Sequence, residues 1–176
     1  CGVLPDTDGL KPTRQVDNFL LRLGRERAMH FPTVMRSDEE EEQFKGAYVM
    51  DPPEYAGFIE HGQVADFASL YPSIIITWNM SPETIMGSGR EPVPGRIARA
   101  PRTNVNFDQT TEGILPFALK ELLRLRKHWS MLQASFAPGT VEALDAERRS
   151  KAYKVAANSF YGVIGAQTSR YYDRDV

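Results

Sequence analysis

The 176-residue sequence predicts an α+β fold in which strands and short helices are followed by a hairpin of two long antiparallel helices. Residues 64–75 follow a strand–turn–helix pattern, because a short apolar run precedes a proline that can open a helix. Residues 113–133 and 140–161 are long enough for two helices, and a Pro-Gly pair at 138–139 marks the turn between them. A content of 41% hydrophobic and 25% charged residues is ordinary for a globular protein with a real core.

Composition excludes several function classes. No apolar run approaches the ~18 residues of a membrane span and no secretory signal is visible, so we expect no membrane partner and an intracellular location, in host cytoplasm or nucleus. The single cysteine, Cys1, excludes an internal disulfide and a cysteine-based zinc cluster. The net charge of −2 gives no global sign of nucleic acid, but residues 117–154 carry an excess of basic side chains and are the better nucleic-acid surface.

The first predicted element is a short amphipathic helix over residues 17–29. Val16, Phe19, Leu20 and Leu23 recur at helical spacing, which indicates a face packed on the core. The acidic run at 37–42 that follows is typical of a solvated loop or helix start, and it predicts no chemistry.

The strand–turn–helix at 64–75 carries the first candidate site. Val64 to Phe67 reads as a short buried strand, and Pro72 suits the first helical position. Backbone N–H groups of the turn and of the first helical residues would then point at one small volume, which favours a phosphate chain. Asp66 would stand beside that volume, and Mg²⁺ prefers carboxylates together with phosphate oxygens. The pattern therefore indicates magnesium-dependent phosphoryl or nucleotidyl transfer, with a turn-forming or helix-capping aspartate as the plain alternative.

The next segment connects this site to the long helices. Residues 74–78 form a strongly apolar helical turn, and Ser81-Pro82-Glu83 predicts the start of a new short helix. Residues 87–106 are rich in Gly, Pro and Arg without periodicity, so we expect a surface connection there. No dinucleotide or P-loop fingerprint occurs anywhere.

The helix predicted at 113–133 has two distinct faces. At 100° per residue one face is apolar and the opposite face is basic; the apolar side chains are Leu115, Leu119, Leu122, Leu123 and Trp129, and the basic ones Lys120, Arg124 and Lys127. Arg126 falls on the apolar face. A guanidinium on a packed stripe needs an anionic partner because an unpaired buried charge is costly, unless the side chain extends to water.

The helix predicted at 140–161, which Thr140 can cap, presents a polar stripe. Lys151, Lys154, Asn158 and Tyr161 fall within roughly 80° of one another by the helical period. This stripe suits phosphates and a base pair, with Gly162 allowing close stacking, whereas spacing alone favours an exposed face with incidental lysines.

Two specific motifs resemble those of the family B (alpha-like) DNA polymerases. The run Asp66-x-x-Ser-Leu-Tyr-Pro-Ser-Ile-Ile75 resembles the family's first polymerase motif, and Lys154-x-x-x-Asn-Ser-x-Tyr-Gly162 resembles its fingers motif. Residues 113–127 are similar to the family's first fingers helix, although Ser130 stands where the family commonly has a lysine. Residues 44–49 more weakly resemble an aromatic-x-Gly-Gly/Ala element that touches the template strand.

The resemblance implies a division of the chain. Residues 1–43 would be a lead-in segment, 44–106 part of the palm with the first motif, 107–165 the fingers helices, and 166–176 the start of a return to the palm. We expect an internal piece of such a polymerase, of viral source, that adds dNTPs to a primer 3′-hydroxyl on a DNA template by two-metal transfer. Mg²⁺ is the expected cofactor, as two ions in the complete enzyme, with Mn²⁺ as an alternative. A processivity factor would bind outside this segment.

The resemblance also implies roles for single residues. Asp66 would be the catalytic carboxylate and would hold metal together with the backbone carbonyl of Phe67. The incoming dNTP would be bound by Ser69, Leu70, Tyr71, Arg126, Lys154 and Asn158. Tyr161, Gly162 and Gly46 would contact the base pair or template.

Asp6-Thr7-Asp8 is similar to the catalytic triplet of the same family, but it precedes the other motifs and lies between Pro5 and Gly9. Ordinary turn chemistry explains it better, so the second metal-binding carboxylate is expected outside this chain. Two rival interpretations remain open, namely a nucleic-acid-binding module without catalysis and a helical packing protein. Metal-dependent dNTP binding would exclude the first, and salt-sensitive DNA binding would exclude the second.

Overall fold

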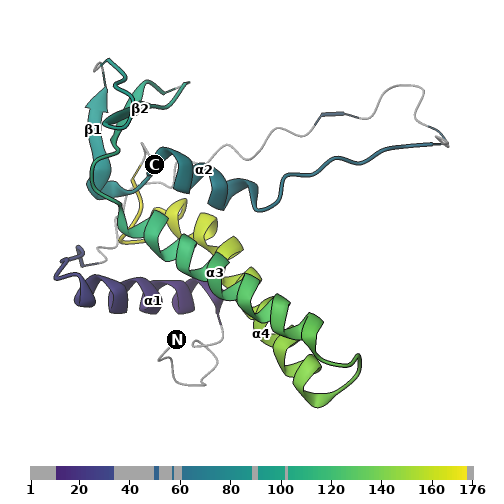
Figure 1. Ribbon diagram of the computed structural model, residues 1–176. Coiled ribbons are helices and arrows are strands. Elements are labelled where there is room, and N and C mark those ends of the chain that lie inside the picture. The colour runs from purple at the N-terminus through teal and green to yellow at the C-terminus, as the bar shows by residue number, and fades with distance from the viewer. Residues whose placement is uncertain are drawn as a thin grey trace.

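Figure 1 shows a computed structural model of the protein, which describes residues 11–33, 50–51, 57, 61–88, 91–101 and 103–173. Its helices are α1 (Pro12–Glu26), α2 (Leu70–Trp78), α3 (Ile114–Ser135) and α4 (Val141–Ile164), with one 3-10 turn, η1 (Pro82–Thr84). Its strands are β1 (Ile85–Ser88), β2 (Ile97–Arg99) and β3 (Val105–Asp108). This mixture of helices and strands agrees with the predicted α+β class.

The hairpin of α3 and α4 is the largest element of the fold. The two helices run side by side and antiparallel, and their joined tip projects away from the remaining elements (Figure 1). Both helices lie close to their predicted ranges, and the predicted cap of α4 is confirmed because the Thr140 hydroxyl accepts a hydrogen bond from the amide N–H of Ala143.

The core lies at the base of this hairpin, where α1 packs across α3 and α4. Helix α1 begins at Pro12, five residues before the predicted start, because a proline is well tolerated in the first turn. Its predicted apolar face is confirmed, since the four residues Val16, Phe19, Leu20 and Leu23 are all buried. Phe31 then folds back onto Gly24, where a Cβ atom would lie 2.1 Å from the ring of Phe31.

The segment after α4 ties the two ends of the described chain together. The Arg170 guanidinium donates to both carboxylate oxygens of Asp17 on α1, at 2.9 and 3.4 Å, and also to the carbonyl of Pro32. Tyr171 is buried beside Phe31 with an edge-to-face ring contact. Burial raises the pKa of the Tyr171 hydroxyl well above its usual range, so this group stays neutral.

The expected surface connection at 87–106 is wrong in part. Strands β1, β3 and β2 form an antiparallel sheet in that order, with Ala98 opposite Phe107 and Ile85 opposite Phe107 on the other side. Strands of three or four residues are too short to show alternation in sequence. Two glycines have positive φ, Gly87 within β1 and Gly95 just before β2. The helix expected at Ser81-Pro82-Glu83 is a single 3-10 turn before β1.

The strand expected at Val64–Phe67 is also wrong. Residues 62–67 are irregular, and Val64 and Phe67 are 98% and 75% exposed. A strand needs a neighbour to receive its hydrogen bonds, and within the described ranges no strand lies beside this segment. Local apolar content alone therefore did not determine the structure of this segment.

Helix α2 follows directly and begins two residues earlier than expected. Pro72 occupies its third position, still in the first turn, where a missing N–H costs no helical hydrogen bond. Ser69 precedes α2 in the left-handed conformation, with φ 56° and ψ 51°. This sharp turn directs the irregular segment at 62–67 away from the helix.

Candidate functional site

The candidate site is built around the N-terminal end of α2. Asp66 and Phe67 lie on the exposed segment that leads into it, and Ser69 makes the left-handed turn. The amide N–H groups of Leu70 and Tyr71 belong to the first turn, which has no acceptors within its own helix. Asp66 thus lies on an exposed irregular segment four residues before the first residue of α2, and not at a strand end.

Arg126 on α3 reaches this turn from the hairpin. Its guanidinium is partly buried, and Nη1 lies 3.4 Å from the hydroxyl oxygen of Ser69. The two residues are 57 positions apart in the sequence. The structure therefore brings a cation to the N-terminal end of α2, where the first-turn amides lie. The positive charge of Arg126 and the N–H donors of this turn together favour binding of an anion.

The apolar face predicted for α3 is confirmed. Leu115, Leu119 and Leu122 are buried, whereas Lys120 and Arg124 are exposed. Lys120 pairs with Glu112, and Arg124 pairs with Glu121 and holds the pKa of that carboxyl below its usual value. Lys120 and Arg124 are thus engaged in local surface pairs, whereas Arg126 contacts Ser69 at the start of α2.

Helix α4 carries the polar stripe, which is exposed as expected. Lys154, Asn158, Tyr161 and Gly162 are all exposed on it. Lys151 is also exposed but pairs with Glu147 one turn earlier on the same helix. A Cβ atom at Gly162 would meet no other atom within 4 Å, so the space above this glycine is open.

Tyr161 and Tyr71 form a contact that sequence reasoning missed. Their rings stack with centroids 4.5 Å apart and planes inclined by 24°. Burial raises the pKa of the Tyr161 hydroxyl, with a smaller contribution from Tyr71 nearby, so Tyr161 is a neutral phenol at physiological pH. The sequence motifs predict separate roles for the two tyrosines. Their contact could not be predicted, because only the tertiary structure places the start of α2 against the end of α4.

Two predicted features lie outside the residues that the structure describes. These are Gly46, with its template-contact element at 44–49, and the Asp6-Thr7-Asp8 triplet. Among the described residues, no group of three or more His, Cys, Asp or Glu side chains could hold a metal ion. Asp66 therefore belongs to no such group in the described part of the chain.

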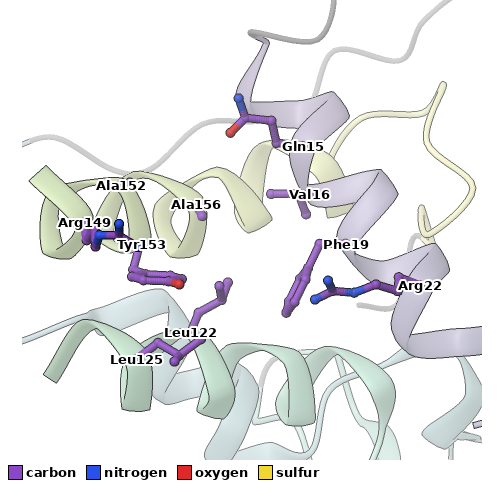
Figure 2. Close-up of a pocket in the computed structure, with 10 residues that line it drawn as sticks. All are labelled: Gln15, Val16, Phe19, Arg22, Leu122, Leu125, Arg149, Ala152, Tyr153 and Ala156. Atoms are coloured by element: carbon purple, nitrogen blue, oxygen red, sulfur yellow. The ribbon is translucent and has the colours of Figure 1, made fainter. Parts of the chain in front are cut away.

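A separate pocket lies between α1 and the two hairpin helices (Figure 2). Its volume is about 330 Å³, and side chains from α1, α3 and α4 line it: Gln15, Val16, Phe19, Arg22, Leu122, Leu125, Arg149, Ala152, Tyr153 and Ala156. None of the predicted site residues belongs to this set. The candidate site is instead an open surface between α2, α3 and α4.

Comparison with known proteins shows the family to which this chain belongs. The sequence matches the family model described as DNA polymerase family B over residues 10–176. The chain belongs to DNA polymerase family B. A solved structure of the family B DNA polymerase from the hyperthermophilic archaeon Pyrobaculum calidifontis superposes with a TM-score of 0.75 at 28% identity, covering 96% of this chain and 22% of that one.

Curated relatives agree with this family B assignment. The chain is 37% identical over 166 residues to a DNA polymerase of Thermococcus gorgonarius and 36% identical over 168 residues to one of Pyrococcus glycovorans. Each match covers 91% of this chain but 20% of the relative, so the chain spans about a fifth of their length. These relatives are archaeal and give no support to the expected viral source. In the described part of the chain, no helix is long and apolar enough to span a membrane.

Proposed function

We propose that this chain forms the nucleotide-binding part of a template-directed DNA polymerase, with residues 44–106 in the palm and 107–165 as the fingers. The observation that carries the proposal is the approach of Arg126 to Ser69, which brings a cation of α3 to the first motif at one partly exposed surface. Such a surface needs an anionic ligand that is supplied from solution. An incoming dNTP has this chemistry.

The triphosphate would bind where the hairpin faces α2. First-turn amides of Leu70 and Tyr71 would donate to its β and γ phosphate oxygens, and Arg126 and Lys154 would neutralise their charge. Asn158 lies one turn beyond Lys154 on the same exposed stripe and would support the site. Arg126 can bind two phosphate oxygens at once through its planar guanidinium, whereas Lys154 acts as a mobile point charge.

Tyr71 and Tyr161 would hold the sugar and base pair of the bound nucleotide. The ring of Tyr71 in the first turn of α2 stacks on the ring of Tyr161, which directly precedes Gly162 on α4. A ring held in this way can exclude a 2′-hydroxyl on the sugar by steric contact, because stacking against Tyr161 restricts its movement. The open space above Gly162 suits the approach of a base pair.

The residues present fit a divalent metal ion of the magnesium type. Asp66 is an exposed carboxylate and the backbone carbonyl of Phe67 is a second hard oxygen ligand, which is the donor set that Mg²⁺ or Mn²⁺ prefers. In the complete enzyme the pair of ions would offset negative charge on the reacting phosphate and would make the primer hydroxyl easier to deprotonate. The second carboxylate of such a site would be contributed from outside the described residues.

The reaction would be attack of a primer 3′-hydroxyl oxygen on the α-phosphorus of the dNTP, with release of pyrophosphate. The chain's own contribution would be to orient the triphosphate along α2 and to stabilise charge on the leaving group through Arg126 and Lys154. DNA template-primer and dNTPs are the proposed partners, and a processivity factor would bind elsewhere.

The test uses a chimeric polymerase in which residues 10–176 replace the matching segment of the Thermococcus gorgonarius enzyme. We expect template-dependent incorporation of dNTPs with Mg²⁺, and its loss in Asp66→Ala. Asp145→Ala is the matched control, because Asp145 is an exposed aspartate near the N-terminal end of α4, where it pairs with Arg149. A folded chimera that binds primer-template but incorporates nothing would instead favour the alternative of an inactive nucleic-acid-binding module.

A further inference from the structure

The first turn of α3 is capped by side chains from a distant segment. Its N-cap residue is Gly113, which has no side chain to cap the helix. Three successive amide N–H groups, those of Gly113, Ile114 and Leu115, instead donate to side-chain oxygens from residues 79–83, which directly follow α2. The acceptors are Asn79 Oδ1 at 3.0 Å, Glu83 Oε1, and Ser81 Oγ at 3.4 Å, respectively.

Asn79 is the central residue of this capping cluster, which consists of Asn79, Ser81, Glu83 and Thr84. It ends α2 in the left-handed conformation with φ 52° and is 6% exposed. Its Oδ1 accepts from the amide of Gly113, and its Nδ2 donates to the carbonyls of Asp108 at 2.6 Å and Thr111 at 2.8 Å. One side-chain amide thus joins the end of α2, the end of β3 and the start of α3.

The rest of the cluster leaves little freedom at this junction. The Thr84 hydroxyl lies 2.6 Å from the carbonyl of Asn79, and the Ser81 hydroxyl donates to Glu83 at 2.7 Å. Ser81 also packs against Gly113, where an added Cβ would lie 2.6 Å from the Cβ of Ser81. Close packing together with fully used hydrogen-bonding groups makes this junction rigid.

A small tilt of α3 at this junction would displace residues further along the helix by a larger distance. Arg126 lies 13 residues beyond Gly113, so at 1.5 Å per residue it is about 20 Å along α3, and a tilt of about 5° at the junction would move it by about 2 Å. The Ser69 end of α2 lies on the other side of the same junction. A misplacement of about 1 Å in a site of this kind can reduce activity about a hundredfold.

We propose that Asn79 is a positioning residue, which fixes the tilt of α3 relative to α2 and thereby the distance between Arg126 and the triphosphate bound at the start of α2. This inference rests on the proposed nucleotide role of Arg126. Asn79 does not touch the nucleotide and acts only through the direction of the fingers helix.

The test is the substitution Asn79→Asp in the chimeric polymerase. The side chain keeps its shape, but an oxygen replaces the Nδ2 donor and faces two carbonyl oxygens. We expect the KM for dNTP to rise about tenfold or more, while the Kd for primer-template stays within about twofold. Asn104→Asp is the matched control, because Asn104 is an exposed asparagine that is also left-handed, with φ 58°.

A double variant separates positioning from general loss of structure. If Asn79 acts through Arg126, then Asn79→Asp should add little to the KM increase already caused by Arg126→Ala. Multiplicative effects of the two substitutions would overturn the proposal. Glu83→Ala provides a second test if Asn79→Asp does not fold, because Glu83 is exposed and accepts from the amide of Ile114 and from the hydroxyl of Ser81. This substitution should also raise the KM for dNTP.

The outcomes also distinguish this inference from the proposed function. An unchanged KM in Arg126→Ala would refute the nucleotide role of Arg126 and both proposals with it. A raised KM in Arg126→Ala, together with an unchanged KM in Asn79→Asp and in Glu83→Ala, would refute only the positioning role of Asn79.

Discussion

Arg126 combines two properties that are seldom found in one side chain of a packed helix. Its stem lies on the same side of α3 as the buried leucines, while its guanidinium ends 3.4 Å from the hydroxyl of Ser69, a neutral partner. A hydroxyl does not neutralise a cation, so the charge retains its attraction for an anion. The pattern of the helix predicted that Arg126 faces inward, but its approach to Ser69 depends on tertiary packing across 57 residues and could not be predicted from periodicity.

The first prediction at residue scale concerns the charges of the site. In the chimera, Arg126→Ala and Lys154→Ala should each remove roughly 1.5 to 3 kcal/mol of charge-assisted contact with dNTP, which corresponds to a loss in kcat/KM of about tenfold to more than a hundredfold. Lys120→Ala is the control, because Lys120 pairs with Glu112 on the exposed face of α3. Equal effects of all three substitutions in steady-state incorporation would contradict the distinction between the two helix faces.

A second prediction concerns sugar selection by Tyr71. Its ring stacks on Tyr161, so its position is restrained from a second helix. Tyr71→Ala removes the bulk under the sugar and should raise ribonucleotide incorporation relative to deoxyribonucleotide incorporation, measured with matched rNTP and dNTP. Tyr153→Ala is a suitable control because Tyr153 lines the pocket of Figure 2 instead. Discrimination that is the same in Tyr71→Ala as in the parent would argue against this role.

At the scale of elements, the length of each helix or strand decided whether its range could be predicted from the sequence. The long helices of the hairpin show several turns of periodicity and have clear turn residues between them, so their ranges were predicted closely. The strands β1, β2 and β3 are too short for a pattern, and the apolar run at 64–67 shows that local composition does not make a strand without a neighbour. The sequence also did not predict that the capping cluster caps the first turn of α3, because only the tertiary structure brings Asn79 to Gly113.

The third prediction concerns the attachment of α1. Asp17 and Arg170 pair across 153 residues, with side chains 33% and 21% exposed. Arg170→Ala should weaken this partly buried pair by roughly 1 to 2 kcal/mol, so that hydrogen exchange of the buried amides of α1 accelerates by about five- to thirtyfold in the chimera. Arg148→Ala removes an exposed arginine in the middle of α4 and should leave α1 exchange unchanged. If both variants exchange at the parent rate, the pair does not anchor α1.

At the scale of the molecule, the candidate site is an open surface on one side of the hairpin. Val64 and Phe67 expose large apolar side chains on the segment that carries Asp66, and Leu70 and Tyr71 are 43% exposed beside them. Adjacent exposed apolar side chains of this kind mark surfaces that bind other parts of a protein or a ligand. The relatives that the chain matches are about five times longer, which is consistent with further contacts to this surface.

The last prediction is that these 176 residues by themselves will not polymerise DNA. Two-metal transfer needs carboxylates on both sides of the ion pair, and Asp66 belongs to no group of three or more possible metal ligands in the described part of the chain. The exposed apolar segment around it should also favour partial folding or aggregation. Primer extension with the purified chain, Mg²⁺ and dNTPs should therefore give no product, whereas the chimera serves as the positive control. Template-dependent extension by the chain alone, if it survives Asp6→Ala and Asp8→Ala but is lost in Asp66→Ala, would show that a second carboxylate is supplied from within these residues after all.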